Sequence, residues 1–311
     1  MKDFAIIADA TCDLPRNIRE EYGIVIVPGH VKKPDGAEMT DVTEWTEMTR
    51  EEFYADLKRH PNDYTTSPPN INEFEAAFEK AVADGLDVVA LTISGSISGA
   101  FGFASAAAKN VLERHPGARI VCLDSRRFGP GFGLLCVHAA TERRNGKSFD
   151  EVIAYVEENK NRFHQAGWLD DLSFVAKKGR LTHAKMFFGP LAGIKPIGEF
   201  DYNGLTTVIG KFKGAKAAYA ALLDYIANTV EDPENQIIFI AQTNRLPQAE
   251  EYRRLIIEKF RPKEVLIQDV LPSCGVNVGP GLMAAYYVGK PISQGLVEER
   301  AIIDAFSRKG E

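Results

Sequence analysis

Short apolar runs rich in β-branched residues alternate with longer helical patterns along the chain. Residues 88–93 predict a buried strand, and residues 118–123 predict the next one. Between them, residues 99–115 repeat alanine or valine every three to four positions, which predicts a helix with one small-residue face. A strand, a helix and a second strand in this order favour a right-handed crossover between parallel strands.

The rest of the chain continues this alternation, which is typical of α/β architecture. Asn145-Gly146-Lys147-Ser148 predicts a turn in which Ser148 caps the following helix, and Tyr202-Asn203-Gly204 predicts a hairpin turn. Further strands or apolar strand-like segments are predicted at Phe4–Ala8, Gly23–Pro28, Trp168–Leu169, Ile194–Ile197, Leu205–Ile209, Gln236–Ala241, Glu264–Val270 and Leu282–Val288, and further helices at Glu51–Arg59, Ile71–Ala83, Gly133–Arg144, Phe149–Lys160, Ala215–Thr229 and Gln248–Phe260.

A chain of 311 residues is long for one domain and comfortable for two. We expect an N-terminal α/β domain over residues 1–160 and a C-terminal α/β domain over residues 161–311. Whether the last segment packs back on the first domain stays open at this point.

Composition narrows the class of protein. The chain is 45% hydrophobic and 26% charged, as in ordinary soluble globular proteins. Its net charge of -6 and the lack of a basic stripe argue against nucleic-acid binding. No apolar run approaches the roughly 20 residues that span a membrane, and the N-terminus reads as a strand rather than a signal peptide, so we expect a cytoplasmic protein. Four scattered cysteines and six unclustered histidines predict neither a metal site nor a redox motif, and no cofactor is expected.

The segment Ile93-Ser94-Gly95-Ser96-Ile97-Ser98-Gly99 joins a predicted strand to a predicted helix. Ligands of open α/β sheets bind beyond the carboxyl ends of strands, and a helix N-terminus with free N–H groups and hydroxyls attracts a phosphate or a carboxylate. An ordinary capping loop is an equally valid interpretation. A nucleophile elbow is excluded because Ile97 stands midway between Gly95 and Gly99, and no P-loop sequence is present.

Three other segments are candidate binding elements. The first is Tyr64-Thr65-Thr66-Ser67-Pro68-Pro69-Asn70. Its two prolines keep the backbone extended, so that Thr66 and Ser67 present their hydroxyls at a fixed place. A plain helix-entry loop capped by Asn70 is the simpler interpretation. The second is Lys177-Lys178-Gly179-Arg180, which places three cationic side chains around a glycine. It is either a candidate binding element or a basic turn exposed to solvent. The glycines within residues 274–281 imply that the backbone closely approaches another strand or a ligand.

Taken together, these segments resemble the DegV family of fatty-acid-binding proteins. Seven matches occur in order from about Ile6 to Gly281, so the resemblance covers nearly the whole chain. The matching segments are Ile7–Pro15, Thr66–Pro69, Ser94–Phe101, Leu123–Ser125, Lys177–Arg180, Ile194–Ile197 and Gly279–Gly281.

The resemblance implies two α/β domains, each with a largely parallel or mixed sheet flanked by helices, and one long-chain fatty acid held between or beneath them in a buried tunnel. It implies that Thr66 and Ser94 hold the carboxylate, and that the chain is a carrier that presents the acyl group to a separate ATP-dependent kinase for acyl-phosphate formation. Asn277 stands where many members have histidine, and asparagine cannot ionise. Transient membrane contact stays open. The ligand-binding residues expected on this basis are Thr66, Ser67, Ser94, Gly95, Ser96, Arg180 and Asn277, and the candidates for lining the tunnel are Phe101, Phe103, Phe187, Phe188, Leu191 and Ile194.

Two alternatives accompany the carrier hypothesis. One is a serine-dependent enzyme that acts on a small carboxylate or phosphorylated substrate through Ser94 or Ser96. That chemistry needs a nearby base, for which His138 and His183 are candidates without supporting spacing. The other is a regulatory or scaffold protein whose ligand is incidental.

Overall fold

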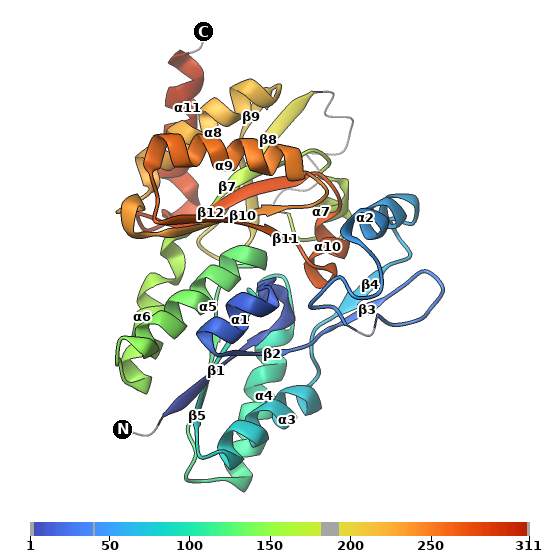
Figure 1. The fold of residues 1–311 in the computed structure, drawn as a ribbon, viewed down its shortest axis with the longest axis vertical. Coiled ribbons are helices and arrows are strands. Elements are labelled where there is room, and N and C mark those ends of the chain that lie inside the picture. Colours follow the sequence, from blue (N-terminus) through green and yellow to red (C-terminus); the bar gives the residue numbers. More distant parts are fainter. Residues whose placement is uncertain (1–2, 40, 182–192, 310–311) are drawn as a thin grey trace. The chain divides into compact units, whose positions relative to one another are not determined.

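The computed structural model describes residues 3–39, 41–181 and 193–309. These residues form two compact units. The first unit comprises residues 1–48, 62–160 and 271–274, and the second comprises residues 49–61, 161–270 and 275–311. Each unit contains its own sheet flanked by helices, so the predicted α/β class is confirmed (Figure 1).

The first unit has a four-stranded parallel sheet in the order β2-β1-β5-β6 and a separate antiparallel ribbon of β3 and β4. The predicted parallel pairing of the strands on either side of α4 is confirmed, because β5 and β6 pair in parallel. The elements of this unit are β1 (Phe4–Asp9), α1 (Arg16–Tyr22), β2 (Ile24–Val27), β3 (His30–Lys32), β4 (Thr65–Ser67), α3 (Ile71–Ala83), β5 (Asp87–Thr92), α4 (Ala100–Arg114), β6 (Ile120–Asp124), α5 (Gly129–Arg144) and α6 (Phe149–Asn159).

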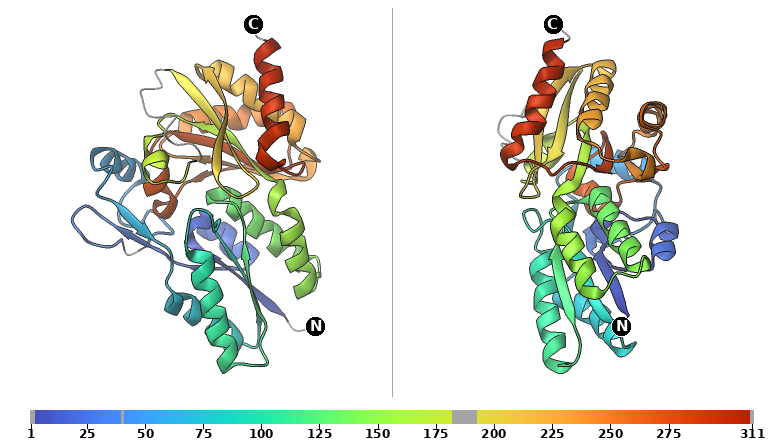
Figure 2. Two further views of the ribbon diagram at one scale, coloured as in Figure 1. Left: turned by 180° about the vertical axis from the view of Figure 1, so that it is seen from behind. Right: turned by 90° about the vertical axis from the view of Figure 1, so that its left-hand side faces the viewer.

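Helices cover both faces of this sheet (Figure 2). On one face α3 and α4 pack through Phe74, Phe78, Ala104 and Ala107 against alternate residues of β1 and β5, and α5 and α6 lie on the other face. The alanines of α4 allow the helix to approach the sheet closely, as its periodicity predicts.

Local sequence explains where several helices begin. Ser148 caps α6 as predicted, since its Oγ accepts a hydrogen bond from Glu151 N while the Glu151 carboxylate accepts one from Ser148 N. Asn70 caps α3 in the same way with Glu73. The predicted start of α5 at Gly133 is wrong. The helix begins at Gly129, because a proline in the first turn does not interrupt a helix.

The second unit has a six-stranded mixed sheet in the order β11-β10-β12-β7-β8-β9. Only β10 and β11 pair in parallel, and the other neighbours are antiparallel. Its elements are α2 (Arg50–Arg59), β7 (Phe163–Leu169), α7 (Ser173–Lys177), β8 (Ile194–Phe200), β9 (Thr206–Lys213), α8 (Ala215–Thr229), β10 (Ile237–Gln242), α9 (Leu246–Phe260), β11 (Glu264–Asp269), β12 (Leu282–Val288) and α11 (Val297–Lys309), and α10 (Pro272–Val278) has residues in both units.

The hairpin predicted at Tyr202–Gly204 joins β8 to β9, and Gly204 takes a left-handed conformation with φ +83°. The glycines of residues 274–281 do allow close approach, but to side chains of this protein. A Cβ on Gly275 would meet Tyr54, and one on Gly279 would meet Phe174. Helix α10, which the sequence pattern does not predict, overlaps this segment at Cys274–Val278.

Candidate functional site

The loop between β5 and α4 is built on hydrogen bonds within the protein. Ile93 N donates to Asp9 Oδ2 (2.8 Å), and Gly95 N donates to Asp124 Oδ1 (3.1 Å). Ser94 N donates to a backbone carbonyl (2.9 Å), and Ser96 N donates to Ser94 Oγ (3.3 Å). The expectation of free N–H groups in this loop is therefore wrong for residues 93–96, because two carboxylates and a carbonyl of neighbouring segments and the Ser94 hydroxyl already accept them.

Ser94 is the hydroxyl of this loop that is best placed to hold a ligand. The residue is 0% exposed. Among the described residues, its hydroxyl accepts the hydrogen bond from Ser96 N and donates to no acceptor. The Ser94 proton is thus available to an acceptor such as a carboxylate oxygen, which is the acceptor-only group that a hydroxyl donor suits. α4 begins at Ala100, and its N-cap residue Gly99 has no side chain to accept from the first turn, whereas Ser98 Oγ accepts from Ala100 N (3.3 Å).

Two carboxylates hold the loop in place, and sequence analysis assigned neither of them a role. Asp9 ends β1, is 0% exposed, and also accepts from Thr11 N (3.0 Å). Burial raises the pKa of Asp9, against the lowering effect of these hydrogen bonds. Asp124 ends β6 and also accepts from Arg126 N (2.9 Å). A Cβ on Gly95 would lie 2.9 Å from Asp124 Oδ2, so glycine is required for this close approach. The sequence feature that points to both carboxylates is an aspartate directly after each of two apolar runs, at the end of the predicted strand.

Thr66 and Ser67 lie on β4, one of the two strands of the β3–β4 ribbon in the first unit. Thr66 pairs with Val31 and is half-buried, whereas Ser67 pairs with His30 and is exposed. The extended backbone predicted before Pro68 is confirmed as a strand. Ser94, Gly95 and Ser96 belong to the same unit, so the two hydroxyl-bearing segments lie in one compact body.

The other two predicted ligand residues belong to the second unit. Arg180 is exposed and donates to the carbonyl of Lys178 across Gly179, which has φ +73°. The pKa of Lys178 is lowered mainly by partial burial and also by the nearby positive charge of Arg180. Asn277 is half-buried on α10.

Of the candidates for lining a tunnel, Phe187, Phe188 and Leu191 lie outside the described residues, as does His183. The expectation is wrong for Phe103, which is 40% exposed because it lies on the outward side of α4.

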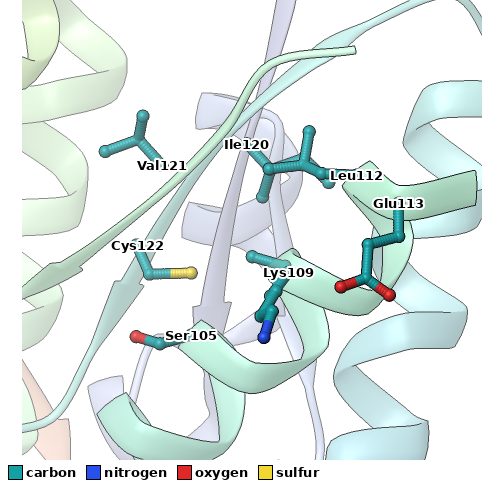
Figure 3. A pocket seen from close by; sticks show the side chains of 8 residues that line it. Ser105, Lys109, Leu112, Glu113, Ile120, Val121 and Cys122 are labelled. Carbon is teal, nitrogen blue, oxygen red and sulfur yellow. The ribbon is translucent and has the colours of Figure 1, made fainter. Parts of the chain in front are cut away.

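A groove runs beside β6, the edge strand of the first sheet (Figure 3). Figure 3 shows the side chain of Cys122 on β6 near Ser105 on α4. None of the lining residues belongs to the Ser94 loop or to β4, so this groove is separate from the two hydroxyl-bearing segments. The lining residues are Ser105, Ala108, Lys109, Leu112, Glu113, Ile120, Val121 and Cys122.

The described part of the chain has neither a metal-binding cluster nor a membrane-spanning helix. Over residues 3–39, 41–181 and 193–309, no group of three or more histidine, cysteine, aspartate or glutamate side chains has a geometry that would hold a metal ion. Within the same ranges, no helix is both long and apolar enough to cross a membrane.

Comparison with known proteins defines the family. Residues 3–290 match the family model described as "Uncharacterised protein, DegV family". The chain therefore belongs to the DegV family, as its motifs suggest. A DegV domain-containing protein of Clostridium perfringens is 31% identical over 289 residues, which cover 93% of this chain and 98% of that protein.

Solved structures share the fold. A DegV family protein from Thermus thermophilus, described in terms of its fatty acid binding, superimposes with a TM-score of 0.82 at 24% identity, covering 93% of this chain and 100% of that chain. DegV from Bacillus subtilis, described as a fatty acid binding protein, gives a TM-score of 0.75 at 26% identity with the same coverage.

Proposed function

We propose that this chain binds a single long-chain fatty acid in a buried tunnel and acts as a carrier, with Ser94 and Thr66 as the donors to its carboxylate. Two kinds of evidence support the proposal. Relatives of the same family are described as fatty acid binding, including the Bacillus subtilis protein at 26% identity. Independently, Ser94 has a hydroxyl that is buried and lacks an acceptor within the described residues, which is the observation that carries the head-group assignment.

Physical chemistry fits a ligand of this kind. Burying about fourteen methylenes at roughly 0.8 kcal/mol each gives on the order of 11 kcal/mol before the losses on association. A carboxylate taken out of water must find hydrogen-bond donors. Ser94 and Thr66 supply two hydroxyls, Ser67 and Ser96 are near them in sequence, and Gly95 lets the loop backbone pack against Asp124. Arg180 and Asn277 are proposed as further ligand-binding residues.

We also propose that the loaded protein presents the acyl group to a separate ATP-dependent kinase. Formation of acyl-phosphate should then require three components together: the kinase, ATP and this protein loaded with lipid. Any acyl-phosphate that forms without this protein would contradict the carrier role.

The first test is native mass spectrometry of freshly purified protein, followed by lipid extraction of the same sample. We expect one bound long-chain fatty acid and thermal stabilisation by added fatty acid. Protein that carries no lipid and gains no stability would contradict the proposal. It would favour the serine-dependent enzyme, although His138, one of its candidate bases, already contacts Tyr155 OH through Nδ1 at 3.0 Å.

The second test addresses the head group. A hydrogen bond to a charged group contributes about 1.5–3 kcal/mol, so Ser94→Ala should weaken fatty-acid binding by roughly 10- to 100-fold, and Thr66→Ala should act in the same direction. Ser105→Ala is the matched control, because Ser105 Oγ donates within α4 to Phe101 O (2.7 Å) and should leave affinity unchanged. Wild-type affinity in both Ser94→Ala and Thr66→Ala would place the carboxylate elsewhere.

A further inference from the structure

The β3–β4 ribbon carries Thr66, one of the two proposed head-group donors, and it is separate from the four-stranded sheet of the same unit. Each of its strands has 3 residues, and an isolated two-stranded ribbon is only marginally stable in water. Val31, which is 0% exposed and pairs with Thr66, anchors the ribbon through its apolar side chain. The polar contacts of the ribbon therefore bear on how firmly Thr66 is held.

His30 on β3 links the ribbon to α3. Its Nε2 lies 2.9 Å from Glu73 Oε1, in the first turn of that helix, and its Nδ1 lies 3.3 Å from Glu38 Oε2. The same Glu73 carboxylate accepts from Asn70 N (2.7 Å) in the capping box of α3. Within the ribbon, His30 pairs with Ser67. These contacts close a ring that runs from His30 through Ser67, Asn70 and Glu73 back to His30.

Both ring nitrogens of His30 face carboxylates, which accept hydrogen bonds and cannot donate them when ionised. A neutral imidazole has a single N–H, so only the doubly protonated, positively charged ring satisfies both contacts. Among the described residues, Glu73 and Glu38 are the charged groups that face the ring, and β4 contributes the uncharged Ser67 opposite it.

The charge of His30 depends on pH in a defined direction. Its pKa is raised above the ordinary value of 6.5, mainly by the hydrogen bond to Glu73 and also by the charges of both glutamates, against the lowering effect of partial burial. For a group whose pKa is raised in the folded state, the stabilisation is complete below the ordinary value and is lost as the pH rises through the raised one. The link from the ribbon to α3 is therefore strongest in weakly acidic solution.

We propose that His30 is a positioning residue for head-group binding, and that its second proton strengthens fatty-acid binding by holding the ribbon, with Thr66, against α3. Without that proton the link to Glu73 loses its charge, and a smaller share of the protein has Thr66 in the arrangement that a ligand needs. By linkage, a bound ligand must in turn favour the protonated ring. This inference rests on the proposed function and adds regulation by pH to the same site.

The first measurement is the affinity of the delipidated full chain for palmitic acid from about pH 6 to about pH 8.5. A partly exposed ion pair contributes little, so we expect binding to weaken by about twofold to fivefold over this range. His30→Gln removes the titrating proton and should bind throughout as the wild type does at the upper pH. Glu73→Gln should act in the same way, because glutamine also completes a capping box and so preserves the start of α3. Titration of the fatty acid itself affects every variant alike, so each profile is taken as a ratio to that of His30→Gln.

His115→Gln is the matched control. His115 forms the same kind of pair with Glu79 (2.7 Å), which joins the end of α4 to α3 rather than to the ribbon. The side chains of His115 and His30 are 40% and 31% exposed, so the two pairs are similarly placed towards solvent. This variant should keep the pH profile of the wild type.

The second measurement is the pKa of His30 by NMR, with its ring signals assigned by their absence in His30→Gln. Loading with palmitic acid should raise this pKa by about 0.3–0.7, which is the counterpart of the expected change in affinity. A pair that only stabilises the fold would have the same pKa in the empty and the loaded protein. An unchanged pKa, or a wild-type pH profile parallel to that of His30→Gln, would overturn the inference. If palmitic acid binds at no pH, the proposed function itself fails.

Discussion

Glu199 is the best position at which to test how the second unit is held together. Its side chain is 0% exposed and accepts four hydrogen bonds: from Gln165 N (2.7 Å), Phe200 N (2.8 Å), Tyr225 OH (2.7 Å) and the ring of His164 through Nδ1 (2.8 Å). The regular pairing of β8 is interrupted near Glu199 by a register shift between Ile197 and Gly198. The carboxylate therefore takes over as acceptor for backbone donors at this irregularity.

Glu199→Leu removes this acceptor without opening a large cavity. It leaves two buried backbone N–H groups and the Tyr225 hydroxyl without their partner. The pKa of Tyr225 is raised mainly by burial and also by the charge of Glu199. Because burial remains in the variant, the phenol stays protonated and continues to need an acceptor. Each unsatisfied buried group costs about 1–3 kcal/mol, and breaking a buried pair costs about 3–5 kcal/mol, so we expect the variant to lose about 3–5 kcal/mol of unfolding free energy.

Glu199→Gln should lose less. Its amide oxygen still accepts from Gln165 N and Phe200 N, and its NH2 group takes the place of the oxygen that faces His164 and Tyr225, so that mainly the Tyr225 hydroxyl is left without an acceptor. We expect a loss of about 1–2 kcal/mol. His164→Leu combined with Glu199→Leu should cost less than the sum of the two single changes, because neither member of the pair is then left buried without the other.

The assay is urea unfolding followed by tryptophan fluorescence in a Trp45→Phe background. The chain has two tryptophans, and Trp168, buried on β7, then reports on the second unit alone. The control is Glu258→Leu, where the same replacement removes a side chain that is 71% exposed, and it should change stability by at most about 0.5 kcal/mol. A loss below about 1 kcal/mol in Glu199→Leu, or equal losses in the Leu and Gln variants, would refute the reasoning.

Two further predictions concern pH and packing. Burial lowers the pKa of His138 from 6.5 to about 4, so the stability from this neutral ring is complete above pH 6.5 and is lost as the pH falls towards 4. Between these values the wild type should lose roughly 2–3 kcal/mol more than His138→Gln, and urea midpoints with parallel pH profiles would contradict this. In thermal unfolding, Gly167→Ala should destabilise the protein by about 3 kcal/mol or more, because the new Cβ would lie 2.3 Å from Met283 O and from the Ala284 Cβ. Gly102→Ala is the control. A Cβ on Gly102 has nothing within 4 Å, so this change should be neutral or stabilising by up to about 1 kcal/mol.

Elements with strong periodicity were predicted to the residue. The helices predicted at Ile71–Ala83 and Ala215–Thr229 match α3 and α8, whereas Leu282–Val288, which is only apolar in the sequence, forms β12. The errors occur where tertiary contacts outweigh local preference. The start of α5 was placed at Gly133, but this glycine packs its backbone against Cys12 O, where a Cβ would lie only 2.3 Å away. Glycines that look like helix breakers in the sequence are here close-packed helix residues.

The sequence indicates candidate residues for the site but not how those residues are hydrogen-bonded. The hydroxyls of Ser94 and Thr66 can be read from the sequence. That Asp9 and Asp124 are acceptors for the loop cannot, because each is far from residues 93–95 in sequence and comes near them only through strand order in the sheet.

The bonding of the loop bears on how a head group would be recognised. Asp9 and Asp124 draw the N–H groups of Ile93 and Gly95 away from any ligand, and these carboxyls add no attraction for an anion. What the loop offers instead is one buried hydroxyl, that of Ser94, held in a fixed place by the bonds on either side of it. Fixed neutral donors recognise an acceptor by position and lose little side-chain freedom when they bind it. A loop built in this way suits a ligand whose affinity comes mainly from its apolar tail, with the head group setting its orientation.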